Sequence, residues 1–412
     1  MKNGDEDMLF KLESESVREC LLQRKFGVER EGLRVCMDGT LAQSPHPFGE
    51  HPNIDRDFCE NQIELISDAL DEPEQVNEQL LQLQRIVNGK LRENHELLWA
   101  FSNPPKISGE DEIPVAQYNG SLQSKSIYRQ YLAQKYGKKK MLFSGIHLNL
   151  SFSDALIHAA FLQSGADDLA DFKNRLYLTL AERMVQYAWL VVYLTAASPV
   201  TDPTIGTGSN VYASVRCSKM GYWNHFTPIL DFTSLHRYVG SIQSYIDNGN
   251  LRSASELYYP VRLKPKGVNT LDNLAATGIN HLEFRVIDVN PLTPTGIFTE
   301  DMHFVYLLML YLASLPEKHL TDKEQQSAIN DVKAAAVFGN TAIRQRTKAV
   351  LTELQAFVQR YLPSYSRIID YQLNKTVAGG SYAEIISERF GDDYMKKGLA
   401  LAADYQERVG YV

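Results

Sequence analysis

The segment GIHLNLSF, residues 145–152, alternates apolar with polar residues along its length. Successive side chains of a β-strand point to opposite faces, so residues two apart share a face. The apolar residues would then pack against other parts of the chain, and His147, Asn149 and Ser151 would line the opposite face. The segment therefore predicts a half-buried strand within a sheet.

The segment HLEFRVID repeats this pattern further along the chain. Its apolar residues Leu282, Phe284 and Val286 alternate with the charged residues Glu283 and Arg285. We expect the three apolar residues on one face of a strand and the two charged residues on the other. The polar face of this strand would then carry both an acid and a base.

Two more segments, GVEREGLRV and NQIELIS, place carboxylates in the same way. Glu29 and Glu31 are two apart and point together, whereas Arg30 lies on the reverse face. In the second segment, Glu64 lies between two apolar residues. If all four strands belong to one sheet, one face carries Glu29, Glu31, Glu64, His147 and Glu283.

Such a face is unusual because most of its charged side chains are negative. Clustered carboxylates repel one another unless cations lie among them. Oxygen ligands suit Mg²⁺ or Mn²⁺, and these ions also hold phosphates. Asp57, seven residues before Glu64, would add another oxygen at the edge of the sheet. The pattern indicates a divalent cation site.

Amphipathic patterns, with apolar residues three and four apart, predict long helices between and after these strands. The predicted helices span 73–98, 168–196, 298–315, 325–337, 343–361 and 393–408. Strands separated by long, uneven insertions favour a mixed or antiparallel sheet over a doubly wound one. The expected fold class is α+β, with an almost wholly helical region after Pro294.

The composition is that of an ordinary globular protein, with 412 residues, 44% apolar residues and a formal net charge of −8. An acidic chain gives no indication of a nucleic-acid partner or an anionic membrane surface. The four cysteines are scattered, and the acidic start lacks the apolar core of a signal peptide. We therefore expect a reduced, cytoplasmic enzyme. The sequence contains no GxxxxGK[ST] phosphate loop and no GxGxxG segment after a strand.

Charged residues that alternate along a single strand are most often a solvated face, and four such strands leave the two interpretations about even. A histidine between apolar residues is more often hydrogen-bonded within the fold than bound to a metal. Later basic residues, Arg216, Arg262 and Lys264, are candidate anion contacts, although single basic residues usually lie at the surface.

Eight segments, in this order along the chain, resemble the glutamate–cysteine ligase family. They are GVEREGLRV (27–35), DFCENQIELIS (57–67), AQYNGS (116–121), IYRQYLAQKYG (127–137), SGIHLNLSF (144–152), ASVRCSKMGY (213–222), ELYYPVRLKPK (256–266) and HLEFRVIDVNP (281–291). The resemblance is to the type found in enterobacteria and at the front of fused bacterial glutathione synthetases.

This resemblance implies a fold like that of glutamine synthetase, in which a funnel of antiparallel strands is surrounded by helices. It also implies roles for individual residues. The expected metal ligands are Glu29, Glu31, Asp57, Glu64, His147 and Glu283, with Glu29, Glu283 and Arg285 at the reacting phosphates. Arg262, Lys264 and Arg285 are expected to contact ATP, and Phe58, Tyr128, Arg216, Tyr222 and Tyr258 the acceptor.

The implied reaction joins the γ-carboxylate of L-glutamate to the amino group of L-cysteine, through a γ-glutamyl phosphate made from ATP with Mg²⁺ or Mn²⁺. Two alternatives stay open: a γ-glutamyl ligase with another small acceptor, and a non-catalytic relative that binds nucleotide or metal. Trp223 and His225 lie where acceptor choice would be decided. We expect residues 1–297 to form the catalytic region and residues 298–412 a helical region packed on it.

Overall fold

The alternating segments form one antiparallel sheet, which contains seven strands in the computed structural model of residues 8–206 and 211–409. Its strand order is β2–β3–β1–β5–β7–β6, and β4 pairs with the far end of β1. The strands are β1 (Arg24–Cys36), β2 (Ile54–Arg56), β3 (Gln62–Ile66), β4 (Glu96–Leu98), β5 (Gly145–Phe152), β6 (Val261–Lys264) and β7 (His281–Asp288). The predicted α+β class with an antiparallel sheet is confirmed.

The register brings the polar residues of neighbouring strands to one face. Glu29 of β1 lies opposite His147 of β5, and Glu31 lies opposite Glu64 of β3. On the other side of β5, Asn149 lies opposite Glu283 of β7. Residues that pair directly across an antiparallel ladder share a face, so the acidic residues converge on one side of the sheet, as their alternation predicted.

The predicted apolar face of β7 needs one correction. The register between β5 and β7 shifts between Ile146, which pairs with Ile287, and Leu148, which pairs with Phe284. One residue of β5 therefore opposes two of β7, which is a β-bulge. Ile287, and not Val286, continues the apolar face beyond the bulge. Strict alternation in the sequence gave no sign of this extra residue.

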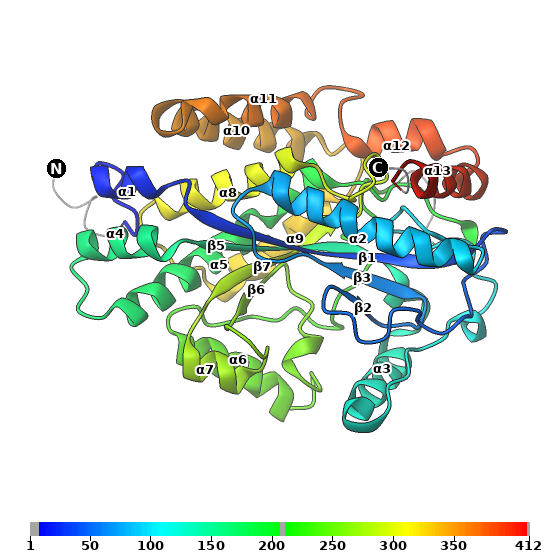
Figure 1. Ribbon diagram of the computed structural model, residues 1–412. Helices are drawn as coiled ribbons and strands as arrows, with labels where there is room; N and C mark the ends of the chain where they lie inside the picture. The colour runs from blue at the N-terminus through cyan, green and yellow to red at the C-terminus, as the bar shows by residue number, and fades with distance from the viewer. Residues whose placement is uncertain (1–7, 207–210, 410–412) are drawn as a thin grey trace.

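Helices cover the apolar face of the sheet and enclose its edges (Figure 1). They are α1 (Glu15–Cys20), α2 (Pro73–Glu93), α3 (Gln123–Tyr136), α4 (Asp154–Ser164), α5 (Leu169–Thr195), α6 (Leu235–Asp247), α7 (Leu271–Thr277), α8 (Thr299–Ala313), α9 (Asp322–Ala335), α10 (Thr341–Tyr361), α11 (Ser366–Asn374), α12 (Tyr382–Phe390) and α13 (Tyr394–Val409). Among the described helices, none combines the length and the hydropathy that crossing a bilayer requires.

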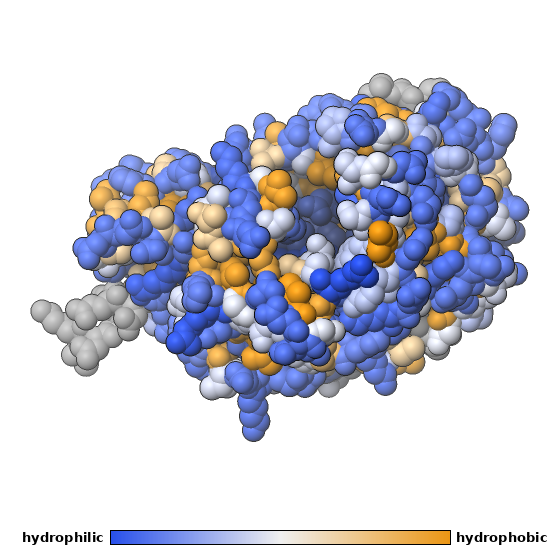
Figure 2. All heavy atoms as spheres, turned by 90° about the horizontal axis from the view of Figure 1, so that it is seen from below, coloured by the Kyte–Doolittle hydropathy of each residue, from blue (hydrophilic) through white to orange (hydrophobic). Residues whose placement is uncertain are grey.

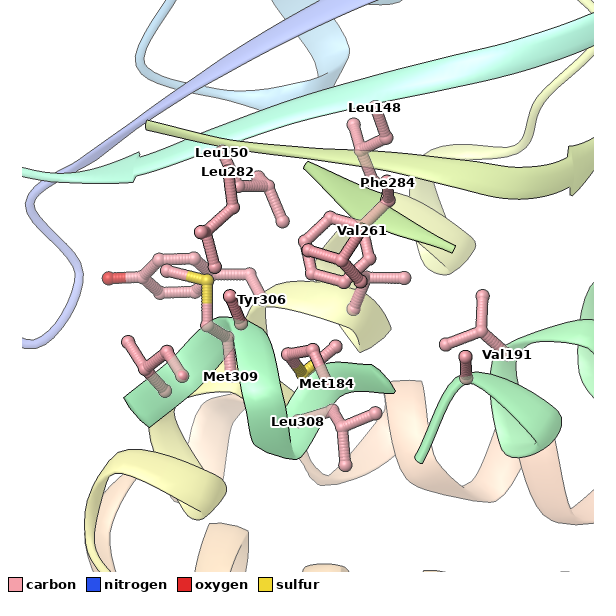
Figure 3. Close-up of a cluster of buried hydrophobic side chains, with 14 of the residues drawn as sticks. Leu148, Leu150, Met184, Val191, Val261, Leu282, Phe284, Tyr306, Leu308 and Met309 are labelled. Atoms are coloured by element: carbon pink, nitrogen blue, oxygen red, sulfur yellow. The ribbon is translucent and has the colours of Figure 1, made fainter. Parts of the chain in front are cut away.

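The main core lies between the apolar face of the sheet and helices α5 and α8. Figure 3 shows Leu148 and Phe284 pointing from the strands toward Met184 of α5 and Leu308 of α8, and all four are at most 1% exposed. Burial of each such side chain contributes about 1.5–3 kcal/mol relative to exposure. This packing holds the reverse, polar face of the sheet in a fixed position.

The helix predicted at 73–98 was too long. It ends at Glu93, because Asn94 closes the last turn and His95 has a positive φ of 55°. The buried Glu96 then begins β4 and accepts a hydrogen bond of 2.8 Å from Arg34. The apolar residues after Glu96 continue the helical spacing in the sequence, but they pair with β1.

On the polar side of the sheet, α3 projects at one end and the α6–α7 pair projects at the other (Figure 1). Figure 2 shows the molecule from this side, with a hollow whose interior carries hydrophilic residues. The division at residue 297 stays a prediction. Apolar residues from before and after it share one continuous core, which includes Leu150, Leu282 and Leu308.

Candidate active site

A cavity of about 190 Å³ lies over the polar face of the sheet and brings the predicted residues together. Its lining includes Glu29, Glu31, Asp57, Glu64, Tyr128, His147, Arg216, Tyr222, Tyr258, Arg262, Lys264, Glu283 and Arg285. Phe58 does not line it. This residue is 1% exposed and belongs to the same apolar cluster as Leu132 and Tyr258, which do line the cavity.

His147 joins the two carboxylates of β1. Its Nδ1 lies 3.1 Å from Oε2 of Glu29, and its Nε2 lies 3.6 Å from Oε1 of Glu31. The other carboxylate oxygen of Glu31 accepts a hydrogen bond of 2.7 Å from the backbone N–H of Gly145. Burial alone would raise the pKa of Glu29, but the hydrogen bond from His147, together with the charges of His147 and Lys264, lowers it below its ordinary value.

Glu283 lies between two bases. Its side chain is 1% exposed, and its two oxygens lie 2.9 Å from Nζ of Lys264 and 3.0 Å from Nη1 of Arg285. Burial alone disfavours the charged carboxylate, but Arg285 and Lys264 overcome it and hold the pKa of Glu283 well below its ordinary value. Lys264 and Arg285, which would bind a phosphate, thus already pair with the carboxylate of Glu283.

Glu64 has the opposite electrostatic environment. Burial, followed by repulsion from Glu29, Asp57 and Glu31, raises its pKa well above the ordinary value. Burial likewise raises the pKa of Glu31. A bound divalent cation would lower the pKa of both Glu64 and Glu31, because it neutralises the carboxylates that repel one another.

The donor atoms fit such a cation. One group consists of Glu29, His147 and Glu283, and a second of Glu31, Glu64 and His147. In each group the ligand atoms lie within 4.8 Å of one another. Carboxylate oxygens with one imidazole and no thiolate suit Mg²⁺ or Mn²⁺. The residues therefore fit the predicted metal.

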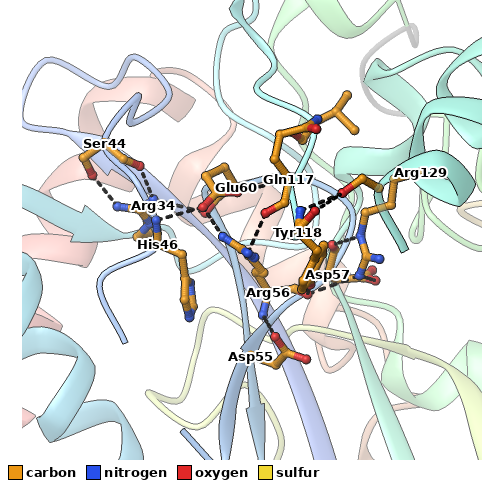
Figure 4. A network of polar contacts seen from close by, with 12 residues as sticks. Arg34, Ser44, His46, Asp55, Arg56, Asp57, Glu60, Gln117, Tyr118 and Arg129 are labelled. Atoms are coloured by element: carbon orange, nitrogen blue, oxygen red, sulfur yellow. Dashed lines mark hydrogen bonds and ion pairs between the residues drawn. The ribbon is translucent and has the colours of Figure 1, made fainter. Parts of the chain in front are cut away.

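Asp57 lies at the rim of this cluster, with its side chain 42% exposed. Arg129 of α3 holds the local backbone, because its guanidinium donates to the carbonyl oxygens of Asp57 and Arg56 (Figure 4). Nη2 of Arg129 also lies 4.0 Å from Oδ1 of Asp57. Asp57 is thus positioned from outside the sheet, and it belongs to neither of the two close donor groups.

An aromatic wall closes the other end of the cavity. The ring centroids of Tyr222 and Tyr258 are 4.0 Å apart, and burial raises the pKa of both hydroxyl groups. Arg216 packs beside them and donates to the carbonyl oxygens of Arg285 (2.9 Å) and Ile287 (3.3 Å). A Cβ at position 145 would lie 2.1 Å from Nη2 of Arg216, so glycine there leaves the space that this guanidinium occupies.

Sequence reasoning missed several residues of the site. Leu132, Met141 and Phe143 line the apolar end of the cavity and come from α3 and the turn after it. No local sequence pattern identifies these three residues, because the direction in which their side chains point depends on how α3 folds back over the sheet. Asn149, by contrast, could have been predicted from the sequence. It shares the polar face of β5 with His147, and it donates to Glu29 over 3.2 Å.

A second, larger cavity of about 780 Å³ adjoins the first along β1 and β5. The two share Glu29, and the larger one continues past Gly27, Asn149 and Ser151 to His281. The side-chain oxygen of Asn149 is buried and has no hydrogen-bond partner among the described residues. Burial together with nearby Lys264 lowers the pKa of His281 to about 4, so this imidazole is neutral at physiological pH.

Comparisons with known proteins show the family to which the chain belongs. A family model described as glutamate-cysteine ligase matches residues 9–253 and 246–335. The glutathione biosynthesis bifunctional protein GshAB of Listeria innocua is 34% identical over 96% of this chain and 56% of its own length. That of Clostridium perfringens is 29% identical over 98% of this chain and 57% of its own length. The chain thus spans about half the length of the curated relatives it matches.

Solved structures show the same fold. The bifunctional glutathione synthetase from Pasteurella multocida superposes with a TM-score of 0.88 and 29% identity, over 98% of this chain and 55% of that protein. A glutamate–cysteine ligase from Francisella tularensis gives a TM-score of 0.85 at 22% identity, over 95% of this chain and 89% of that one. The family model covers most of the chain, and the Listeria protein extends the match to nearly all of it. This chain belongs to the glutamate–cysteine ligase family.

Proposed function

We propose that this protein joins the γ-carboxylate of L-glutamate to the amino group of L-cysteine, with ATP as the phosphoryl donor and Mg²⁺ as the metal. The observation that carries the proposal is the meeting, on one face of one sheet, of two carboxylate–histidine groups with Lys264 and Arg285. Family membership supports the same reaction.

The larger cavity is the place we assign to the nucleoside of ATP. Its volume of about 780 Å³ suits a ligand of that size. It ends at Glu29, so a nucleotide lying along β1 and β5 would bring its phosphates to the acidic cluster. The unpartnered side-chain oxygen of Asn149 supplies a hydrogen-bond acceptor at this junction.

Phosphoryl transfer to the γ-carboxylate gives a γ-glutamyl phosphate, and the amine then displaces phosphate. Bound Mg²⁺ would neutralise charge on the phosphates during this transfer. Arg285 offers a guanidinium fork that suits phosphate oxygens, and Lys264 offers a point charge beside it. Arg262 already donates to the carbonyl oxygens of Ser255 and Leu257 at 2.8 Å each. We therefore assign it a smaller part in binding the phosphates than Arg285 and Lys264.

The acceptor occupies the opposite end of the smaller cavity. Arg216 is our choice for its carboxylate, because guanidinium groups bind carboxylates through two parallel hydrogen bonds. Tyr128, Tyr222 and Tyr258 would enclose its side chain, and sulfur packs favourably against aromatic rings. Phe58 packs in the same apolar cluster as this wall and does not line the cavity.

The test is release of ADP from ATP in the presence of glutamate, Mg²⁺ and a panel of single amino acids. We expect release with cysteine, together with formation of γ-glutamylcysteine. Release only with another amine would keep the chemistry and replace the acceptor. No release with any amine, while ATP binds, would overturn the proposed reaction.

A further inference from the structure

A buried carboxylate outside the metal cluster ties the acceptor end of the cavity together. Glu256 is 0% exposed and precedes Tyr258 of the aromatic wall by two residues. Its Oε1 accepts hydrogen bonds from Nζ of Lys135 (2.5 Å) and from the hydroxyl of Tyr136 (2.7 Å). Its Oε2 accepts from the backbone N–H of Arg252 at 2.6 Å.

The same residue also joins a third segment. The side-chain N–H₂ of Asn224 donates to the backbone carbonyl of Glu256 at 2.8 Å and to the hydroxyl of Tyr136 at 3.1 Å. The side-chain oxygen of Asn224 in turn accepts from the backbone N–H of Tyr258 at 2.9 Å. Helix α3, the segment around Asn224 and the turn before Tyr258 therefore meet at one residue: α3 and the turn bind the carboxylate of Glu256, and Asn224 binds its backbone carbonyl and the hydroxyl of Tyr136.

Each of these three parts brings one tyrosine to the cavity. Helix α3 carries Tyr128, the segment around Asn224 carries Tyr222, and the turn carries Tyr258. The ring of Tyr136 also packs edge-on against that of Tyr258, with centroids 5.3 Å apart. The positions of the three tyrosines consequently depend on the hydrogen bonds of Glu256.

A buried ion pair is a poor source of stability, because removing two charges from water offsets most of their attraction. What such a pair supplies is a fixed geometry, since each partner is satisfied in one arrangement. Helix α3 projects from the body of the molecule in Figure 1, so its inner face needs an attachment of this kind. Lys135 and Tyr136 of its last turn provide that attachment.

We propose that Glu256 is a positioning residue for the acceptor: through Lys135, Tyr136 and Asn224 it sets the spacing of the three tyrosines that enclose the acceptor's side chain. This inference rests on the proposed function, since it concerns the acceptor end of the same site. Glu256 does not line the cavity. Its effect therefore passes through the residues that it holds.

The test compares Glu256→Gln and Tyr136→Phe with the wild-type protein in steady-state kinetics. Glutamine keeps the shape of Glu256 but removes the charge that faces Lys135, and phenylalanine removes only the hydroxyl. We expect each to raise the KM for cysteine about tenfold, the cost of one hydrogen bond to a charged group. The KM values for ATP and glutamate, and kcat at saturating cysteine, should change about twofold at most.

The matched control is Lys375→Met, which breaks another buried ion pair, with Asp301 at 2.5 Å, away from the cavity. It should lower stability and leave the KM for cysteine unchanged. If Glu256→Gln behaves like this control, or lowers only kcat in proportion to the folded fraction, Glu256 is merely structural and the inference fails. A wild-type protein that releases no ADP with any amino acid would overturn the proposed function and this inference together.

Discussion

Lys264 and Glu283 form an ion pair across β6 and β7, with Nζ of the lysine 2.9 Å from Oε1 of the glutamate. The glutamate side chain is 1% exposed and the lysine side chain 14%. Together with Arg285, the lysine supplies the positive charge that this buried carboxylate requires. A metal that binds Glu283 would take over this task and release Lys264 toward a phosphate.

Replacing Lys264 by Met tests this exchange. We expect the KM for ATP to rise about tenfold, because one charge-assisted contact to phosphate is lost. The KM for cysteine should not change, since the acceptor lies at the other end of the cavity. Lys266→Met is the control, because Lys266 is exposed two residues further on. Equal KM values for ATP in both variants would place Lys264 outside the phosphate site.

Glu283→Gln should nearly abolish formation of ADP. A single electrostatic stabiliser at a reacting centre contributes about a hundredfold or more to the rate, and glutamine is a weaker metal ligand than a carboxylate. The variant should remain folded, because Asn149 and Arg262, its cross-strand neighbours, keep their backbone pairing. Circular dichroism and turnover across a magnesium titration check this. Turnover equal to that of the exposed control Glu78→Gln would remove Glu283 from the site.

Stabilisation by magnesium should grow with pH. Burial and repulsion from neighbouring acids raise the pKa of Glu64 well above its ordinary value of 4.5, so the folded protein keeps a proton that the unfolded chain has lost. The free energy of unfolding of the metal-free protein therefore falls as pH rises through this window. Magnesium needs the deprotonated carboxylate, so its stabilising effect increases over the same range.

Thermal unfolding with and without magnesium, from mildly acidic to neutral pH, measures this effect. Glu64→Gln should flatten the dependence, because the titrating group is gone. A magnesium-induced shift in the melting temperature that is the same at every pH would show that no raised carboxylate takes part in metal binding.

The ion pair of Lys375 and Asp301 marks the place where a substitution in the helical C-terminal region should lower the stability of the fold most. Both side chains are 3% exposed, and the pair joins the C-cap residue of α11 to α8, with further hydrogen bonds to Asp301 from Tyr382 (2.8 Å) and Gln372 (3.0 Å). Lys375→Met leaves a buried carboxylate without its cation and should lower the free energy of unfolding by about 3–5 kcal/mol. Asp331→Asn breaks the ion pair of Asp331 with Arg346, which is much more exposed than that of Lys375 with Asp301, and should cost at most about 1 kcal/mol in the same denaturant titration.

Period-two alternation was enough to predict the sheet face that carries Glu29, Glu64 and Glu283, because direct pairing across an antiparallel ladder preserves the face. It could not show the bulge opposite His147, which depends on the partner strand. Nor could it show that Phe58 does not line the cavity, or that Glu256 links three segments. These features arise from contacts between residues far apart in the sequence, whereas the alternation reports only local facing.

Acceptor choice should depend on Arg216. Its guanidinium donates to the carbonyl oxygens of Arg285 and Ile287, so its position is fixed before any ligand arrives. A guanidinium has five N–H donors, which leaves donors for a carboxylate beyond those two contacts. Arg216→Ala should raise the KM for cysteine about ten- to a hundredfold, the cost of a bidentate charge-assisted contact. Arg216→Lys should recover only part of this loss, because an ammonium group lacks the planar fork.

The same variant separates the acceptor from glutamate. Steady-state kinetics with varied cysteine and varied glutamate should show a large change in the first KM and little in the second. Arg237→Ala is the control, because this arginine is 67% exposed on α6 and pairs only with Asp231 among the described acids. If the KM for glutamate rises and that for cysteine does not, Arg216 belongs to the glutamate end of the cavity, and the aromatic wall must then recognise the acceptor without it.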